Sequence, residues 1–317
     1  MNAIETTVRT INPLNNKIIK EYNLETWEEV SNKLKQANVA FDQWKYQSYA
    51  QRAAFFMEAA KILRENKEEY ATQITLEMGK PILQSIAEVE KSALVCAFYA
   101  ENAADFLANQ NIETEFSQSY VTYQPLGTVL QVMPWNFPFW QVFRFAAPAL
   151  MAGNVTVLKH ALNVIGCGDL ICDVFKKAGF PKGVFQHVVI DNELVEDILA
   201  EESVHGVALT GSVLAGKAVG GLAGKNLMEC VLELGGSDAF IVLKDADLPT
   251  AAKVAIQSRM HNSGQTCISA KRFIVEESVA EAFKTLLKEE LETVVIGDPM
   301  DAATKVSVMA RPDLVEK

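Results

Sequence analysis

The segment Gly206-Val207-Ala208-Leu209-Thr210-Gly211-Ser212-Val213-Leu214-Ala215-Gly216 decides the fold of this chain. Its first four residues predict a strand, Thr210 to Ser212 predict a turn, and the residues from Val213 predict a helix. A second strand is predicted at Met228–Leu234. A strand, a helix and a second strand in this order are typical of a parallel sheet.

The same alternation of strand and helix signals runs from residue 128 to residue 291. The predicted strands are Thr128–Met133, Asn154–Lys159, Val184–Val189, Gly206–Leu209, Met228–Leu234, Ala239–Leu243 and Arg272–Val275. The predicted helices are Phe139–Met151, Val164–Ala178, Glu193–Glu201, Val213–Leu222, Leu248–Met260 and Val279–Leu291. Such alternation predicts an α/β fold with parallel sheets.

Other features divide the chain. Residues 26–107 repeat apolar residues at helical spacing, and Gly79-Lys80-Pro81 separates two of the helices. Residues 112–125 are alternating and β-branched, which predicts an extended hairpin. Because 317 residues are too many for one simple core, we expect two domains, with a hinge at Gly235-Gly236.

The composition excludes several classes of function. The net charge is −11, from 29 basic and 40 acidic residues, and no basic block is present, so nucleic-acid binding is not expected. The N-terminus lacks an apolar signal segment, and the apolar stretch Val142–Leu158 is interrupted, so neither secretion nor a membrane span is expected. The cysteines show no C-x-x-C spacing and the histidines no metal-ligand spacing. We therefore expect a cytoplasmic protein with reduced thiols and no bound metal.

A thiol and a carboxylate carry the strongest chemical signal. Cys267 follows Gly264-Gln265-Thr266, a short polar run whose small residues let a substrate approach the sulfur. Glu233 stands in Val231-Leu232-Glu233-Leu234-Gly235-Gly236, where a carboxylate is either buried at a cost or kept for chemistry. Together they indicate covalent catalysis with a separate base.

Two turns each allow two interpretations. Gly211-Ser212 follows a strand and begins a helix, so it either binds a phosphate through free backbone N–H groups or is an ordinary strand-to-helix turn. Pro134-Trp135-Asn136-Phe137-Pro138 follows another strand. Its Asn136 amide either donates to a developing oxyanion or belongs to a proline-capped turn with a buried Trp135.

Two positively charged side chains also allow two interpretations each. Lys159 ends a predicted strand and either contacts a ribose or phosphate group or is a solvated strand-end lysine. Arg144 lies in an apolar segment and either forms a structural ion pair or binds an anion in a cavity. The other cysteines lie in helical or strand patterns and are predicted to be small core residues: Cys96, Cys167, Cys172 and Cys230.

Taken in order, these motifs resemble the aldehyde dehydrogenase superfamily. The matching segments are Pro134-Trp135-Asn136-Phe137-Pro138, Lys159, Gly211-Ser212 with Gly216, Glu233-Leu234-Gly235-Gly236, and Gly264-Gln265-Thr266-Cys267. Within it, the segments Asn136–Arg144 and Val157–Ala161 are similar to bacterial NAD(P)-dependent succinate-semialdehyde dehydrogenases. The resemblance implies a Rossmann-type parallel-sheet cofactor domain over residues 1–233 and a partial α/β catalytic domain over residues 234–317. It further implies that the hairpin near residues 112–125 serves oligomerisation.

The resemblance also assigns roles. Cys267 attacks the aldehyde and forms a thiohemiacetal and then a thioester, the Asn136 amide and the Cys267 backbone N–H hold the oxyanion, and Glu233 activates water. Arg144 binds the distal carboxylate of succinate semialdehyde. The residues implied to contact NADP or NAD are Trp135, Lys159, Gly211, Ser212, Gly216 and Leu234.

The chain departs from the family pattern at two places. Leu162 stands where NAD-preferring relatives often carry a glutamate that repels a 2′-phosphate, so we expect NADP to be accepted. Family members normally continue well beyond Lys317, so we expect a fragment or a natural truncation. Full-length members form homo-oligomers, which we expect of the whole protein. The alternatives are an inactive truncated homologue that binds a dinucleotide or a full-length partner, and a cysteine amidase or other acyl-transfer enzyme.

Overall fold

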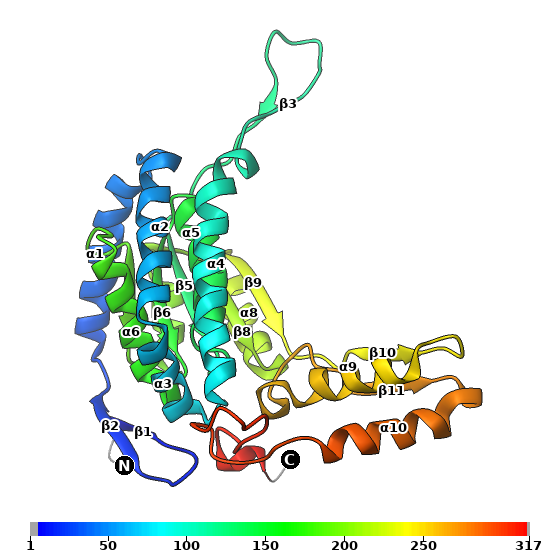
Figure 1. The fold of residues 1–317 in the computed structure, drawn as a ribbon. Helices are drawn as coiled ribbons and strands as arrows, with labels where there is room; N and C mark the ends of the chain where they lie inside the picture. Colours follow the sequence, from blue (N-terminus) through cyan, green and yellow to red (C-terminus); the bar gives the residue numbers. More distant parts are fainter. Residues whose placement is uncertain (1–5, 316–317) are drawn as a thin grey trace.

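The computed structural model describes residues 6–315 (Figure 1). Its strands are β1 (Thr7–Ile11), β2 (Ile18–Asn23), β3 (Gln110–Asn111), β4 (Tyr120–Val121), β5 (Thr128–Met133), β6 (Val155–His160), β7 (Phe185–Val188), β8 (Val204–Gly211), β9 (Glu229–Leu234), β10 (Ala239–Val242) and β11 (Arg272–Val275). Its α-helices are α1 (Trp27–Trp44), α2 (Tyr49–Glu65), α3 (Lys67–Met78), α4 (Ile82–Phe106), α5 (Trp140–Met151), α6 (Ile165–Lys177), α7 (Leu194–Ala200), α8 (Val213–Lys225), α9 (Leu248–Met260) and α10 (Ala280–Glu292).

The central sheet has five parallel strands in the order β7-β6-β5-β8-β9. From β5, the next strands along the chain, β6 and β7, are added on one side of the sheet. The chain then returns to the other side of β5, where β8 and β9 are added, so the strand order reverses between β5 and β8. In open α/β sheets, ligands bind at this reversal, outside the carboxyl ends of the strands. The predicted α/β class and the Rossmann-type sheet are therefore confirmed, and the sheet order itself locates a binding crevice.

The middle of this sheet is buried on both faces. All six residues of β6 are buried, among them the polar Thr156, Lys159 and His160. Helices α5 and α6 pack against the sheet, and α2, α3 and α4 pack in turn against α5 and α6. Helix α8 packs against β8 and β9. A strand buried on both faces tolerates polar residues only where they find partners, which they do near the carboxyl end of β6.

The helices between residues 26 and 107 form as their spacing predicts. Val30, Leu34 and Trp44 of α1 are buried, and the Trp44 indole N–H donates to the carbonyl of Leu150 in α5. The predicted break separates α3 from α4, where Gly79 caps α3 with a φ of 76°. That left-handed conformation suits glycine because it has no Cβ. The corner brings the start of α4 beside the segment that follows β5, because Glu88 of α4 accepts the backbone N–H groups of Phe139 and Trp140.

Two hairpins lie outside the central sheet. The antiparallel pair β1-β2 was not predicted, because its residues are polar and largely exposed. The hairpin predicted over residues 112–125 begins two residues earlier, at Gln110, and its paired strands are only two residues long. It projects away from the body of the molecule (Figure 1). Its role in oligomerisation stays a prediction.

The last third of the chain has its own small core. Strands β10 and β11 form a parallel pair, and α9 and α10 pack beside each other. The buried cluster of this part consists of Val242, Ala252, Ala255 and Phe283. A separate cluster is what a second domain needs, although the boundary at residue 234 stays a prediction.

Strand β9 differs from the expectation for a parallel strand. All six of its residues are exposed, including Cys230, so the prediction that Cys230 is a core residue was wrong. The reason is that β9 is the edge of the sheet, where one side of the strand has no neighbour. Cys96 and Cys167 are buried as predicted, and Cys172 is partly buried.

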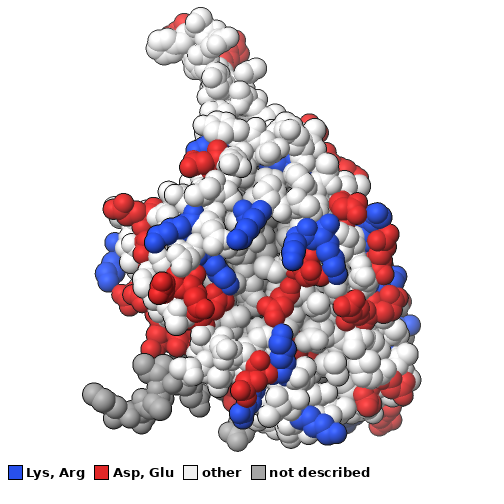
Figure 2. Space-filling model, turned by 90° about the vertical axis from the view of Figure 1, so that its left-hand side faces the viewer, with Lys and Arg blue, Asp and Glu red and all other residues white. Residues whose placement is uncertain are grey.

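The described surface carries charges of both signs. Figure 2 shows Lys and Arg side chains intermixed with Asp and Glu over one face of the molecule. None of the helices in residues 6–315 is both long enough and apolar enough to span a bilayer.

Candidate functional site

Cys267 lies on a loop whose backbone is unusual. Helix α9 is followed by a short 3₁₀ segment, His261–Gly264, in which Asn262, Ser263 and Gly264 have φ values of 54°, 53° and 78°. Left-handed conformations are uncommon for residues other than glycine and persist only where the surrounding structure enforces them. The loop must therefore be held by specific contacts.

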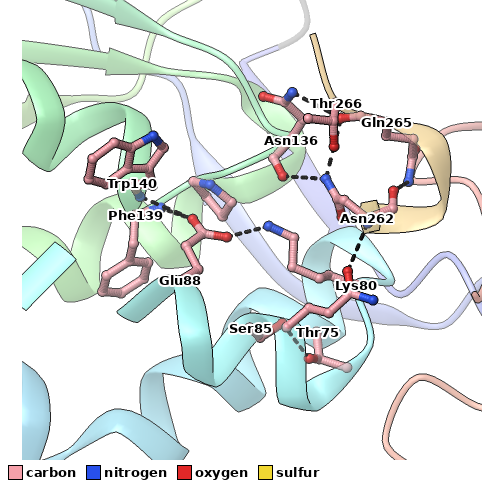
Figure 3. Close-up of polar contacts among 12 residues, drawn as sticks. Thr75, Lys80, Ser85, Glu88, Asn136, Phe139, Trp140, Asn262, Gln265 and Thr266 are labelled. Carbon is pink, nitrogen blue, oxygen red and sulfur yellow. Dashed lines mark hydrogen bonds and ion pairs between the residues drawn. The ribbon is translucent and has the colours of Figure 1, made fainter. Parts of the chain in front are cut away.

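The main contacts come from the loop after β5, which carries Asn136. The Asn262 side-chain amide is fully buried and donates to the Asn136 carbonyl at 2.7 Å. In return, the Asn136 side-chain amide donates to the Gln265 carbonyl at 3.0 Å. These bonds join loops that lie more than 120 residues apart (Figure 3). They place the predicted oxyanion donor and the predicted nucleophile on two loops that are directly bonded to each other.

Further bonds hold the nucleophile loop from its other sides. Ser263 Oγ accepts the backbone N–H of Ser307 at 2.9 Å, and Gln265 Oε1 accepts that of Ala310 at 3.0 Å. The Lys271 ammonium donates to the Cys267 carbonyl at 2.8 Å. Cys267 itself thus sits on a backbone that is fixed on both sides.

The Cys267 side chain is partly exposed and reaches two cavities. The larger, of about 430 Å³, is also lined by Glu233, Trp135 and the Gly211-Ser212 turn. The smaller, of about 240 Å³, is also lined by Lys91, Trp140 and His261. Gln141, Arg144 and Cys267 line both cavities. A molecule in either cavity can therefore reach the thiol.

Glu233 occupies the carboxyl end of β9, on the wall of the larger cavity. Its carboxylate is 3.4 Å from the Arg144 guanidinium, and its side chain is 55% exposed. Of the two interpretations of Glu233, the buried one is therefore wrong, because the edge strand leaves the residue open to solvent. A solvated carboxylate beside a cavity can accept a proton from water.

Two N–H groups are the candidates for the predicted oxyanion site. One hydrogen of the Asn136 amide is used by the Gln265 carbonyl, which leaves the other available. Within residues 6–315, the Cys267 backbone N–H donates no hydrogen bond. Two N–H donors in the cavity that Cys267 lines could stabilise negative charge on an oxygen that is bonded to the attacked carbon.

The larger cavity has the features that a dinucleotide requires. It lies at the carboxyl ends of β5, β8 and β9, and it includes Pro134, Trp135, Gly211, Ser212 and Leu234. Ser212 caps α8 by accepting the Ala215 N–H, so the first turn of a helix faces this edge of the sheet. The residues present therefore fit NADP or NAD, and an aromatic ring and a helix start are available for its phosphates.

Gly216 lies where α8 approaches β9. A Cβ there would lie 2.5 Å from a side-chain carbon of Leu234, so glycine allows α8 to pack closely against β9. Gly216 is buried and is not part of the cavity wall. The predicted role of Gly216 in cofactor binding stays a prediction.

Lys159 is buried, with a residue exposure of 6%, so the interpretation as a solvated lysine was wrong. Its ammonium donates to Asn192 Oδ1 at 2.8 Å, and burial lowers its pKa to about 8. Leu162, in the 3₁₀ turn that follows β6, supplies no carboxylate beside it. Lys159 lies outside the residues that line the larger cavity, at the same edge of the sheet.

Three polar groups near the site were not predicted from the sequence. Asn262 lies within the cysteine motif, but nothing in the sequence indicated that its side chain would hold the Asn136 loop. His160 is buried and neutral, because burial lowers its pKa to about 3, and its ring bonds to the Pro138 carbonyl and to the Ala161 N–H. The ion pair Lys80–Glu88 is fully buried beneath the Asn136 loop (Figure 3). Lys80 and Glu88 could have been noticed as charges within a largely buried helical region.

The geometry predicts which thiols react. Iodoacetamide should alkylate Cys267 and the exposed Cys230 in the folded protein, and peptide mass spectrometry resolves each site. Cys96 and Cys167 should remain unmodified until the chain unfolds, because both are 0% exposed and burial raises the pKa of each thiol. Rapid modification of Cys230 with none at Cys267 would contradict the placement of the nucleophile.

The chain is similar to known proteins over nearly its whole length. A model of the aldehyde dehydrogenase family matches residues 1–317. A Synechocystis protein named "Probable succinate-semialdehyde dehydrogenase (NADP+)" is 48% identical over 97% of this chain and 68% of its own length. The Escherichia coli protein named "Succinate semialdehyde dehydrogenase (NAD(P)+) Sad" is 45% identical over 90% of this chain and 62% of its own length.

A solved structure agrees with the fold. Succinic semialdehyde dehydrogenase from Streptococcus pyogenes, in complex with NADP+, superposes with a TM-score of 0.93 at 36% identity. The match covers 96% of this chain and 67% of that one. The chain thus spans about two thirds of the length of the proteins it matches.

Proposed function

Because this chain belongs to the aldehyde dehydrogenase family, we propose that it oxidises an aldehyde to a carboxylic acid with NADP or NAD as the oxidant. The aldehyde is succinate semialdehyde, and the product is succinate. The observation that carries the proposal is the joint wall of one cavity. Cys267, Asn136 and Glu233 line it together with the Gly211-Ser212 turn.

The reaction begins at the thiol. The Cys267 sulfur, as thiolate, adds to the aldehyde carbon, and the carbonyl oxygen becomes an oxyanion in a thiohemiacetal. The free hydrogen of the Asn136 amide and the Cys267 backbone N–H stabilise that oxygen. Because both loops are bonded to each other, these donors are already in place before the substrate arrives.

NADP or NAD, held against Trp135 and the Gly211-Ser212 turn, would supply the oxidant that accepts the hydride from the carbon attached to Cys267. The carbon then remains attached to Cys267 as a thioester. Glu233 takes a proton from a water molecule, the hydroxide attacks the thioester carbon, and the acid leaves as the Cys267 thiolate is restored. The exposure of Glu233 at the edge strand gives it access to that water.

An anionic tail on the substrate is supported by the cations of the smaller cavity. Arg144 lines both cavities, and Lys91 stands 3.9 Å over the Trp140 ring on the wall of the smaller one. A carboxylate can pair with the Arg144 guanidinium in a bidentate manner. The substrate carboxylate would compete with the Glu233 carboxylate for the Arg144 guanidinium. Glu233 would then be free to interact with water.

The chain should convert succinate semialdehyde and reduce NADP, followed by the absorbance of the reduced nicotinamide. Butanal, an uncharged aldehyde of equal chain length, is the comparison substrate. Cys267→Ala should abolish turnover, and Asn136→Ala should lower kcat by about 10²–10³-fold, because one oxyanion donor is lost. Arg144→Ala should reduce the preference for succinate semialdehyde by about 10–100-fold, the range expected for a hydrogen bond to a charged group.

An unchanged preference in Arg144→Ala would remove Arg144 from the substrate site. Cofactor binding by calorimetry without turnover would instead support an inactive homologue. Conversion of an amide without any nicotinamide would support the acyl-transfer alternative.

The preference for NADP should depend on pH. Protonated Lys159 attracts a 2′-phosphate, and it loses its charge as pH rises through about 8. The value of kcat/KM for NADP, which reports on the free enzyme, should therefore fall above that pH while that for NAD changes less. Lys159→Met should raise the KM for NADP by roughly 10–100-fold and remove the difference in pH dependence. Equal pH profiles for the two cofactors in the parent protein would refute this role.

A further inference from the structure

We propose that Glu88, neutralised by Lys80, is a positioning residue that sets the place of the Asn136 amide relative to the Cys267 sulfur. The inference rests on the proposed function, since it explains how the parts of that site are held. Glu88 lies in the second turn of α4 and lines the smaller cavity that Cys267 also reaches.

The Glu88 carboxylate provides what α5 lacks. Helix α5 has no side-chain cap from its own sequence. Glu88 Oε1 accepts the backbone N–H groups of Phe139 at 2.8 Å and of Trp140 at 3.0 Å. A carboxylate at a helix N-terminus satisfies free donors and interacts favourably with the helix dipole. The start of α5, four residues after Asn136, is therefore fixed by a residue from another helix.

Lys80 neutralises the charge of the Glu88 carboxylate. Its ammonium is fully buried and pairs with Glu88 Oε2 (Figure 3). The same ammonium lies 3.8 Å from the centre of the Phe137 ring, next to Asn136 in the chain. A buried carboxylate without such a partner would be costly. The ion pair thus contacts the residues that follow Asn136 in the chain, at Phe137, Phe139 and Trp140.

The same face of α4 also holds the nucleophile loop. Gln84 precedes Glu88 by four residues, one helical turn, and its Oε1 accepts the Asn262 backbone N–H at 2.7 Å. Asn262 then donates to the Asn136 carbonyl. The first two turns of α4 therefore contact both loops that carry the proposed chemistry, and they set the spacing between those loops.

A purely structural role would predict something different. Buried ion pairs contribute little to stability and can often be replaced by apolar residues of similar volume. If Glu88 and Lys80 served only to fill the core, an apolar pair would replace them without effect on the reaction. What an apolar side chain cannot provide is an acceptor for the Phe139 and Trp140 N–H groups.

The test compares two double variants that both lack the buried charges. Lys80→Met with Glu88→Leu removes the acceptor, whereas Lys80→Met with Glu88→Gln retains an acceptor oxygen. We expect the Leu variant to lose about 10²-fold in kcat, the effect of a misplacement near 1 Å, with an unchanged KM for NADP. The Gln variant should stay within about tenfold of the parent, because its amide oxygen can still accept both of these hydrogen bonds.

Amide hydrogen exchange gives a readout that does not depend on turnover. The backbone amides of Phe139 and Trp140 should exchange faster in the Leu variant than in the parent, and the Gln variant should lie near the parent. If the chain proved inactive, the amide exchange rates alone would test the role of Glu88. Failure of the proposed function is therefore distinguishable from failure of the inference. Iodoacetamide alkylation of Cys267 should be retained in both variants, showing an intact nucleophile loop.

Glu77 is the matched control. It is a buried carboxylate that accepts the Gly166 and Cys167 N–H groups at 2.9 Å and 3.0 Å, and so it caps α6 as Glu88 caps α5. Helix α6 carries none of the proposed catalytic residues. Glu77→Gln should therefore leave kcat unchanged, whatever its effect on the unfolding temperature.

The inference would be overturned if the Leu variant kept the parent kcat and parent exchange rates. It would equally be overturned if the Gln variant lost as much as the Leu variant. If the Leu variant does not fold, Glu88→Asp withdraws the carboxylate by one methylene group while keeping its charge. A kcat and exchange pattern identical to the parent in that folded variant would then refute the role.

Discussion

The site depends on the reciprocal amide bonds between Asn136 and the loop that contains Asn262 and Gln265. Each loop alone would be free to move, and the second contains three successive left-handed residues. Bonded together, they hold a thiol and an amide donor side by side at the reversal point of a parallel sheet. Preorganised donors of this kind stabilise developing charge without the cost of rearrangement during the reaction.

Buried polar groups carry this arrangement. His160 and Glu88 lie within elements whose other residues are mostly apolar, and Asn262 is buried in a short polar segment. Each of the three side chains bonds to the backbone of a segment at the site. A buried polar group is stable only when its partners are supplied, so each of these contacts specifies one loop conformation rather than several. The apolar core makes the fold, and the few polar groups inside it place the reactive residues.

Hydrophobic periodicity and turn residues were sufficient to predict many of the helices and strands. Thr128–Met133, Leu248–Met260 and Arg272–Val275 form with the predicted bounds, and α9 begins at a local cap in which Asp247 accepts the Thr250 N–H. The candidate catalytic residues could be proposed from the sequence because each lies in a local motif. The exposure of β9 and the contacts of Glu88 could not, because they depend on strand order and on pairing between distant segments, which no local pattern encodes.

The central claim is that Cys267 forms a covalent acyl intermediate which Glu233 resolves with water. The most direct measurement is peptide mass spectrometry of a Glu233→Gln variant that is quenched with acid after mixing with succinate semialdehyde and NADP. The account predicts a succinyl thioester on the Cys267 peptide alone, and none when NADP is omitted. Succinate formation without any adduct on Cys267, or an adduct on another cysteine, would contradict it.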